Sequence, residues 1–282
     1  MSGTEKIKEF IPMSLRSKTA SLIFLFFLLL SLSPLNIKAE TGPKIKKGAS
    51  LYCPSKNSRA INYYDQGKTL TGKKKIKEAL NIYLKAIGLD PGFCDAMDNL
   101  GTIYQKGGKA EEAIYWHQKA IEANIKDTSA HVNLAADFRL QNRLRESADE
   151  YKMAIEIDPQ NPEGYFGLGS DYLTIGKSEE ALKELQTAEK LYMEIKSPYL
   201  THARYSIGLA HYFLNDCTSA KSYLEPIYQE FKKDPNINYT LGVCYLRSKE
   251  REKGKNYLQN AKSLGMEQAG NVLDLLESGE FK

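Results

Sequence analysis

The stretch CDAMDNLGTIYQKGGKAEEAIYWHQKAIEANI, residues 94–125, sets the register of the whole chain. Small residues stand at Gly101, Ala113 and Ala120, and steps of 34 residues in either direction meet small residues again. The three columns are Gly67, Gly101, Ala135 and Gly169; Ala79, Ala113, Ser147 and Ala181; and Ala86, Ala120, Ala154 and Ala188. Three columns that keep one period over four repeats indicate a repeat architecture.

Each repeat contains two apolar stretches of helical period, separated by a turn. The predicted turns are Thr71-Gly72, Gly107-Gly108, Gln141-Asn142 and Ile175-Gly176. Pro91 and Pro159 follow the second helices of repeats one and three, because proline cannot continue a helix interior. The pattern therefore predicts helical hairpins stacked in series.

Repeat two closely resembles the tetratricopeptide repeat (TPR) family. That motif has large residues at positions 4, 7 and 11, small residues at 8, 20 and 27, and an aromatic or apolar residue at 24. The matching residues are Met97, Leu100, Gly101, Tyr104, Ala113, His117 and Ala120. Ile125 departs from the motif, which has proline there. The resemblance covers about three quarters of the chain and implies an all-α, right-handed α-solenoid of about six helix-turn-helix hairpins.

The phase breaks after repeat four, because Gly208 follows Gly169 by 39 residues instead of 34. An insertion near residues 192–198 predicts a longer second helix in repeat four, or a longer loop. Pro226 lies inside the expected second helix of repeat five and should kink it. Gly254 replaces alanine in repeat six and should weaken that helix by about 1 kcal/mol.

The predicted organisation has five parts. They are a signal peptide (1–39), a linker (40–57), TPR units 1–4 (58–195), TPR-like units 5–6 (196–266), and a capping helix with its tail (267–282). The capping helix is expected because a repeat array needs an end element with a polar outer face.

The N-terminal segment has the features of an export signal. Residues 22–30 are unbroken apolar sequence, Arg16 and Lys18 precede them, and Ala39 stands where a signal peptidase needs a small residue. The apolar run is shorter than the roughly 20 residues of a comfortable membrane span. We therefore expect an exported chain, periplasmic or secreted. The alternative is an uncleaved anchor, in which case membrane contact is limited to this segment.

The charge of the chain gives no reason to expect nucleic acid binding. Five of the 39 basic residues and two of the 35 acidic residues lie in residues 1–39, so 34 basic and 33 acidic residues remain. Such a nearly neutral body lacks the basic surface that nucleic acid recognition uses.

The sequence also gives no support for catalysis. The four histidines are dispersed, and His117 and His131 occupy packing positions of the motif. No histidine pair has the spacing of a zinc site. Gly176-Lys177-Ser178 is not a phosphate-binding loop, because Asp171 stands where the upstream glycine belongs. We expect a non-enzymatic protein with no cofactor and no metal.

The family resemblance implies a concave groove lined by the first helix of each repeat. The groove candidates are Tyr64, Asp98, Asn99, Asn133, Phe166, Tyr205 and Tyr239. Asn99 and Asn133 match the asparagines that hold a partner's backbone in peptide-binding members; alternatively they merely face solvent. Tyr205 and Tyr239 could anchor apolar side chains of a partner; alternatively they belong to the core.

The four cysteines permit two disulfides in an exported chain. The register of the array suggests Cys53 with Cys94, and Cys217 with Cys244. The alternative is that they are free and buried, because cysteine also packs as a small hydrophobe.

Two function hypotheses follow. The first is an exported scaffold that binds a protein or peptide partner in the concave groove. The second is an accessory subunit of an envelope enzyme or assembly complex that docks by its convex face or its termini. An enzyme would need a buried polar cluster that the sequence does not reveal.

Overall fold

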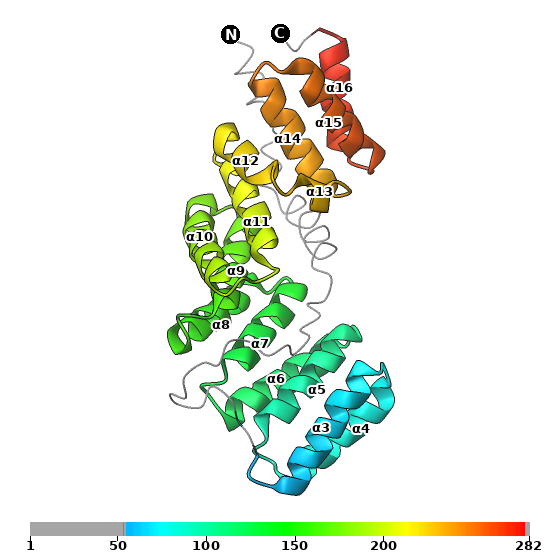
Figure 1. The fold of residues 1–282 in the computed structure, drawn as a ribbon, viewed down its shortest axis with the longest axis vertical. Helices are drawn as coiled ribbons and strands as arrows, with labels where there is room; N and C mark the ends of the chain where they lie inside the picture. Colours follow the sequence, from blue (N-terminus) through cyan, green and yellow to red (C-terminus); the bar gives the residue numbers. More distant parts are fainter. Residues whose placement is uncertain (1–52, 54, 280–282) are drawn as a thin grey trace. The chain divides into compact units, whose positions relative to one another are not determined.

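The structure, a computed structural model, describes Cys53 and residues 55–279 (Figure 1). The predicted signal peptide lies outside the described residues, and so does the predicted linker apart from Cys53 and residues 55–57. The described residues form two compact units, which we call the N-terminal unit (53–171) and the C-terminal unit (172–279).

The N-terminal unit is a series of antiparallel helical hairpins (Figure 1). Its helices are α3 (Ser58–Gly72), α4 (Ile76–Leu89), α5 (Cys94–Lys106), α6 (Ala110–Ala123), α7 (Thr128–Leu140), α8 (Leu144–Ile157) and the first part of α9 (Pro162–Thr174). The pairs α3–α4, α5–α6 and α7–α8 pack face to face. This arrangement confirms the predicted α-solenoid of helix-turn-helix repeats.

The C-terminal unit continues the same architecture with one irregular hairpin. After the end of α9 come α10 (Ser178–Glu194), α11 (Leu200–Phe213), α12 (Cys217–Leu224), α13 (Tyr228–Phe231), α14 (Pro235–Arg247), α15 (Arg251–Ser263) and α16 (Glu267–Glu277). Helix α10 has 17 residues, whereas α8 has 14. The predicted lengthening of the second helix of repeat four is confirmed.

Close approach of paired helices explains the columns of small residues. A Cβ atom added to Gly67 would lie 2.7 Å from the Tyr83 ring, and one added to Gly101 would lie 2.5 Å from the His117 ring. Gly208 and Leu224 repeat this relation in the C-terminal unit at 2.5 Å. A side chain on the first helix would thus occupy the volume that the large residue of the second helix fills.

The turns within the hairpins use residues in the left-handed region. Gly108, Asn142 and Gly176 have φ values of 71°, 58° and 78°, as glycine and asparagine readily adopt. The predicted turn at Thr71-Gly72 is wrong, because α3 continues through Gly72 and Lys74 takes the positive φ of 59°.

Pro226 breaks the second helix of repeat five and does not merely kink it. Helix α12 ends at Leu224, and α13 begins at Tyr228. The reason is that proline has no N–H to donate and its ring collides with the carbonyl four residues earlier. Ile227, between the two helices, stays buried at 4% exposure, so the break is packed into the core.

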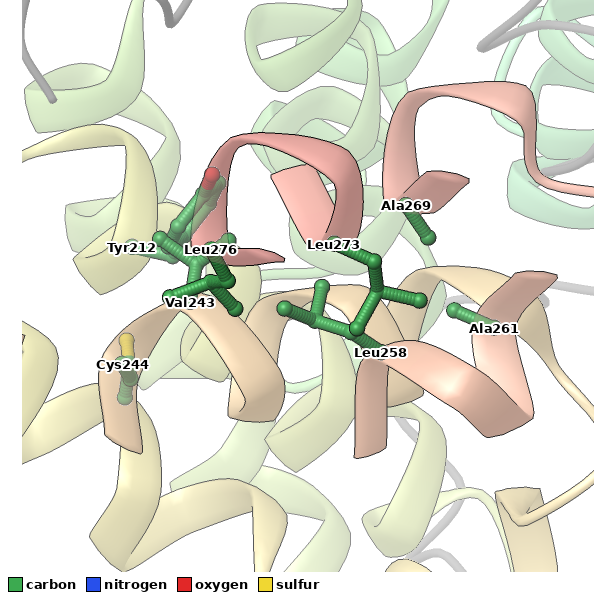
Figure 2. Packing of buried hydrophobic residues seen from close by; sticks show 9 residues of the cluster. Tyr212, Val243, Cys244, Leu258, Ala261, Ala269, Leu273 and Leu276 are labelled. Atoms are coloured by element: carbon green, nitrogen blue, oxygen red, sulfur yellow. The ribbon is translucent and has the colours of Figure 1, made fainter. Parts of the chain in front are cut away.

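Helix α16 covers the end of the array (Figure 2). Ala269, Leu273 and Leu276 pack in one cluster with Val243 and Leu258. The opposite side of α16 carries exposed polar residues, among them Gln268, Asn271 and Asp274. A polar outer face over an apolar inner one is what the end of a repeat array requires.

Residues before α3 cover the beginning of the array. Cys53 is bonded to Cys94, and its backbone N–H donates to Asp95 Oδ1 at 3.2 Å. Asn57 caps α3 through its side chain and donates to the carbonyl of Leu89 at 3.1 Å. These residues fell within the predicted linker, and the structure places them in the fold.

Within the described part of the chain, no helix is both long and apolar enough to cross a membrane.

Gly254 has a packing role that its helix propensity does not reveal. A Cβ added there would lie 2.8 Å from the carbonyl oxygen of Gly242 on α14. We predict that Gly254→Ala lowers the midpoint of thermal unfolding, although alanine favours the helix by about 1 kcal/mol. Gly88→Ala is the matched control, because a Cβ at Gly88 meets no atom within 4 Å. It should leave the midpoint unchanged or raise it. A stabilised Gly254→Ala variant would contradict this prediction, because it would show that a methyl group fits between α14 and α15.

Candidate functional site

Asn99 and Asn133 join neighbouring first helices of the N-terminal unit. Asn99 on α5 donates from Nδ2 to the hydroxyl of Tyr64 on α3 at 3.2 Å and to the carbonyl of Asp95 at 2.8 Å. Asn133 on α7 donates from Nδ2 to Asp98 on α5, at 2.9 Å to Oδ1 and 3.1 Å to Oδ2. We call the surface made by Tyr64, Asp98, Asn99, Val132 and Asn133 the first-helix face.

These contacts limit the hydrogen bonds that the two asparagine side chains can make with a partner. An amide has two donor hydrogens and one acceptor oxygen. The amide nitrogens of Asn99 and Asn133 already donate inside the protein. Their Oδ1 atoms accept no hydrogen bond from the described residues. A partner would therefore meet acceptors here, and a backbone N–H is the natural donor to them.

Carboxylates gather at the N-terminal ends of α5 and α7. Burial raises the pKa of Asp95, and likewise that of Asp98. Asp127 caps α7 by accepting from the N–H of Ala130 at 3.1 Å. Burial, with the nearby charges of Asp98 and Asp95, raises the pKa of Asp127 to about 7. Sequence reasoning missed Asp127, although an aspartate directly before a predicted helix is a known capping signal. It also missed Asp95, which lies in the first turn of α5.

Three potential metal-ligand atoms approach one another near this group, but they do not make a metal site. Cys94 Sγ and carboxylate oxygens of Asp95 and Asp127 lie within 4.8 Å of one another. Cys94 is bonded to Cys53, however. Metals bind the thiolate form of cysteine, so the disulfide removes this ligand.

His117 lies at the centre of a polar cluster between α5, α6 and α7. Its Nδ1 donates to Asp137 Oδ2 at 2.6 Å, and its Nε2 lies 3.6 Å from Asp98 Oδ1. Gln105 Nε2 donates to the other oxygen of Asp137 at 2.7 Å. The ring is fully buried against Gly101. His117 thus has the packing role that its position in the motif predicts, together with an electrostatic role that the motif does not describe.

Arg139 forms a second buried cluster, between α7, α8 and α9. Its Nε donates to Asp171 Oδ1 at 2.7 Å, and its Nη2 donates to the Tyr151 hydroxyl at 2.5 Å and to the carbonyl of Gly167 at 3.1 Å. Ser147 donates to Asp171 Oδ2 at 2.6 Å. A buried ion pair with all of these partners stabilises one arrangement of the three helices.

The C-terminal groove candidates are buried or half-buried, and Tyr205 fits the core alternative. Tyr205 is 6% exposed, stacks on Phe231 and donates its hydroxyl to Asp234 Oδ2 at 3.1 Å, so it is a core residue. Tyr239 is half-buried and packs edge-to-face on the buried Tyr212. Phe166, in the N-terminal unit, is also half-buried. The aromatic surface expected from Tyr205 is therefore not available to a partner in this structure.

Two other histidines, His131 and His211, have polar partners within the fold. His131 Nδ1 lies 2.6 Å from Glu150 Oε2, and its Nε2 lies 3.0 Å from the carbonyl oxygen of Ile125. Both ring nitrogens are thus occupied, which holds the loop before α7 against α8. His211 Nδ1 lies 3.3 Å from Asp216 Oδ2 at the turn after α11.

The structure pairs the cysteines as the array register suggests. The Cα atoms of Cys53 and Cys94 are 5.5 Å apart, and those of Cys217 and Cys244 are 5.0 Å apart. Both separations suit a disulfide. One bond fastens the segment before α3 to α5, and the other fastens α12 to α14.

Comparison with protein families identifies the repeats. Residues 60–93 and 94–126 match models described as tetratricopeptide repeat, and residues 137–176 match a model described as TPR repeat. The TPR repeats predicted in these stretches are confirmed. TPR repeats bind protein or peptide partners. No curated protein matches the chain.

Several solved structures share the fold. PilF of Pseudomonas aeruginosa is 16% identical with a TM-score of 0.67, covering 77% of this chain and 97% of its own. YrrB, described as a TPR protein with an unusual peptide-binding site, is 20% identical with a TM-score of 0.57, covering 68% and 98%. The Cut9–Hcn1 hetero-tetramer of APC/C gives 15% identity and a TM-score of 0.63, covering 93% of this chain and 47% of the matched chain. At these identities the likeness establishes the fold.

We predict that both disulfides stabilise the protein measurably. They close loops of 41 and 27 residues, for which loop entropy gives about 3–4 kcal/mol each. Adding dithiothreitol should lower the midpoint of thermal unfolding of the native protein. The paired variant Cys53→Ser with Cys94→Ser should lose only the first contribution, and Cys217→Ser with Cys244→Ser only the second. Alkylation of four thiols in the native protein, without reductant, would refute the pairing.

Proposed function

We propose that this chain is a non-enzymatic scaffold that binds a protein or peptide segment along the first-helix face of its N-terminal unit. The observation that carries the proposal is the pair of bridges from Asn99 to Tyr64 and from Asn133 to Asp98. They fix the side chains of neighbouring first helices before a partner arrives. Fixed side chains lower the entropy lost on binding.

The chemistry of this face favours an extended polar backbone as the bound group. Asn99 Oδ1 and Asn133 Oδ1 lie on successive first helices and can accept from N–H groups of the partner. Asp98 adds a carboxylate whose side chain is 15% exposed. Tyr64, half-buried and packed against Phe93, adds a partly exposed aromatic ring. A segment that presents N–H donors beside an apolar side chain fits these four residues.

We place the protein in an exported compartment, periplasmic or secreted. Two independent features support this. The sequence of residues 1–39 has the charge and apolar pattern of a signal peptide. The pairs Cys53–Cys94 and Cys217–Cys244 suit an oxidising environment, where disulfides persist. An uncleaved N-terminal segment would keep the same domain at a membrane surface.

A second candidate function is an accessory subunit that docks by its second helices. It is favoured by exposed apolar side chains on α4 and α6. Leu84 is 42% exposed and Tyr115 is 51% exposed. In this case the face opposite to the first helices would contact a larger complex.

Site-specific photo-crosslinking separates the two proposals. A photoreactive amino acid is placed at Val132 or Thr102 on the first helices, or at Tyr115 on α6, in the full chain expressed in its own cells. We predict that Val132 and Thr102 give crosslinks to a partner protein and that Tyr115 does not. Asn99→Ala combined with Asn133→Ala should weaken the crosslink from Val132 by about tenfold, because two bridges and two acceptors are lost.

The matched control is Gln66→Ala with Asn62→Ala, a pair of exposed polar residues that bond each other on α3. It should leave crosslinking unchanged. Crosslinks from Tyr115 alone would favour the accessory-subunit function and contradict binding at the first-helix face.

A further inference from the structure

The two buried polar clusters of the N-terminal unit are related by the repeat. Gln105, His117 and Asp137 form the first cluster, and Arg139, Tyr151 and Asp171 form the second. Each residue of the second set follows its counterpart by 34 positions. In both clusters a first helix supplies a donor, the second helix of the same hairpin supplies a ring, and the next first helix supplies an aspartate. We call them the His117 joint and the Arg139 joint.

The aspartates of the two joints have the same environment. Asp137 and Asp171 are each 1% exposed. Asp137 Oδ1 accepts from Gln105 at 2.7 Å, and Asp171 Oδ1 accepts from Arg139 at 2.7 Å. The second oxygen accepts from His117 in one joint and from Ser147 in the other, both at 2.6 Å. Each joint therefore buries a carboxylate that fastens one hairpin to the next.

The joints differ in where the positive charge comes from. Arg139 is always protonated, so the Arg139 joint keeps its cation at any physiological pH. Gln105, at the equivalent place, is neutral. The His117 joint can be charge-balanced only by the imidazolium form of its ring. Histidine changes its charge near neutral pH.

A second carboxylate strengthens this dependence. Asp98 on α5 faces His117 Nε2 at 3.6 Å, and Val132 stands at the equivalent place in the Arg139 joint. Among the described residues, the Nε2 atom is buried without a hydrogen-bond partner. The ring is thus enclosed between Asp98 from α5 and Asp137 from α7, and no positively charged side chain contacts it from either helix.

We propose that the His117 joint is a pH-operated fastening, in which the imidazolium form of His117 holds α7 onto the α5–α6 hairpin and the neutral form loosens it. The charged ring donates to Asp137 and faces Asp98 with its second N–H. The neutral ring keeps the proton on Nδ1 and presents a lone pair to Asp98, while two carboxylates lose their cation. Asn133 remains bonded to Asp98 in both forms.

The direction of the pH effect follows from the charges. Burial of the ring opposes its charge most strongly, but the hydrogen bond with Asp137 and the charges of Asp98 and Asp137 outweigh it. The pKa of His117 is therefore raised above its usual value of 6.5. Stabilisation by the joint is complete below about pH 6.5 and is lost as pH rises through the higher folded-state pKa.

His131, Asp127 and Asp98 change stability in the same direction as His117. Burial opposes the charge of the His131 ring, but its hydrogen bonds with Glu150 and with the carbonyl of Ile125 outweigh burial and raise its pKa. Burial raises both carboxyl pKa values, so the folded state holds these protons more tightly than the unfolded chain does. For Asp127 this stabilisation is lost between its ordinary value of 3.8 and about pH 7. A test must therefore separate His117 from these three groups.

Hydrogen exchange of the full chain, corrected for the intrinsic rate at each pH, measures the fastening directly. We expect the protection of α7 amides to fall about tenfold or more between about pH 5.5 and about pH 8.5. Gln105→Arg with His117→Tyr gives the first joint the donor and ring of the Arg139 joint. In this variant the pH dependence of α7 protection should shrink to the part contributed by His131, Asp127 and Asp98. Helix α15 of the same molecule serves as an internal control and should show no change.

Two results would overturn the proposal: α7 protection that is the same at both pH values, or an equal pH dependence in the unmutated protein and the double variant. If the variant does not fold, the ring signals of His117 in the unmutated protein decide, assigned through their proximity to Gly101. A titration midpoint above 6.5 supports the fastening, and one at or below 6.5 refutes it.

Discussion

The structure depends on how closely two helices of a hairpin approach each other. That distance is set by a residue without a side chain on one helix and a large side chain on the other. Gly67 opposite Tyr83, Gly101 opposite His117 and Gly208 opposite Leu224 are three instances of one relation. Because each hairpin packs mainly on its neighbours, keeping this distance in every repeat keeps the array regular. The first-helix face and the two polar joints are consequences of that regularity.

Much of this fold can be predicted from the sequence, because the close approach of paired helices requires small residues at regular intervals along the chain. The column containing Ala79, Ala113 and Ala181 follows from the requirement for small side chains, and all three residues are fully buried. The longer α10 follows from the break in phase before Gly208. These features depend on residues near one another in the repeat, where one period describes all contacts.

The sequence leaves alternatives open where a contact is not part of the repeat. Tyr205 stands at a groove position of the motif, but α13 brings Phe231 over its ring. Helix α13 exists separately because Pro226 breaks the preceding helix, and a motif read by position cannot include that. The roles of Asn99 and Asn133 were incomplete for a related reason. Their amide donors are used by Tyr64 and Asp98 of the preceding repeat, a contact across 35 residues that no local pattern indicates.

The repeat motif alone does not reveal the two polar joints. Asp137 and Asp171 occupy the same position in successive repeats, yet the family motif assigns no role to it. Their importance becomes visible only when Gln105 and Arg139 are seen to donate to them. The same site in the fold thus has a permanent cation in one repeat and a titrating one in the repeat before it. Regular packing gives the two joints the same geometry, and differences at single positions give them different charges.

The central claim is that a glycine is required because a large side chain fills its place. A double-mutant cycle on Gly67 and Tyr83 tests this most directly, with the midpoint of thermal unfolding as the readout. Gly67→Ala should be destabilising because its Cβ would lie 2.7 Å from the ring, and Tyr83→Ala because it leaves a cavity. The account predicts that the double variant loses less than the sum of the two, by about 1 kcal/mol or more, since the new methyl group then has space. Losses that simply add would contradict it.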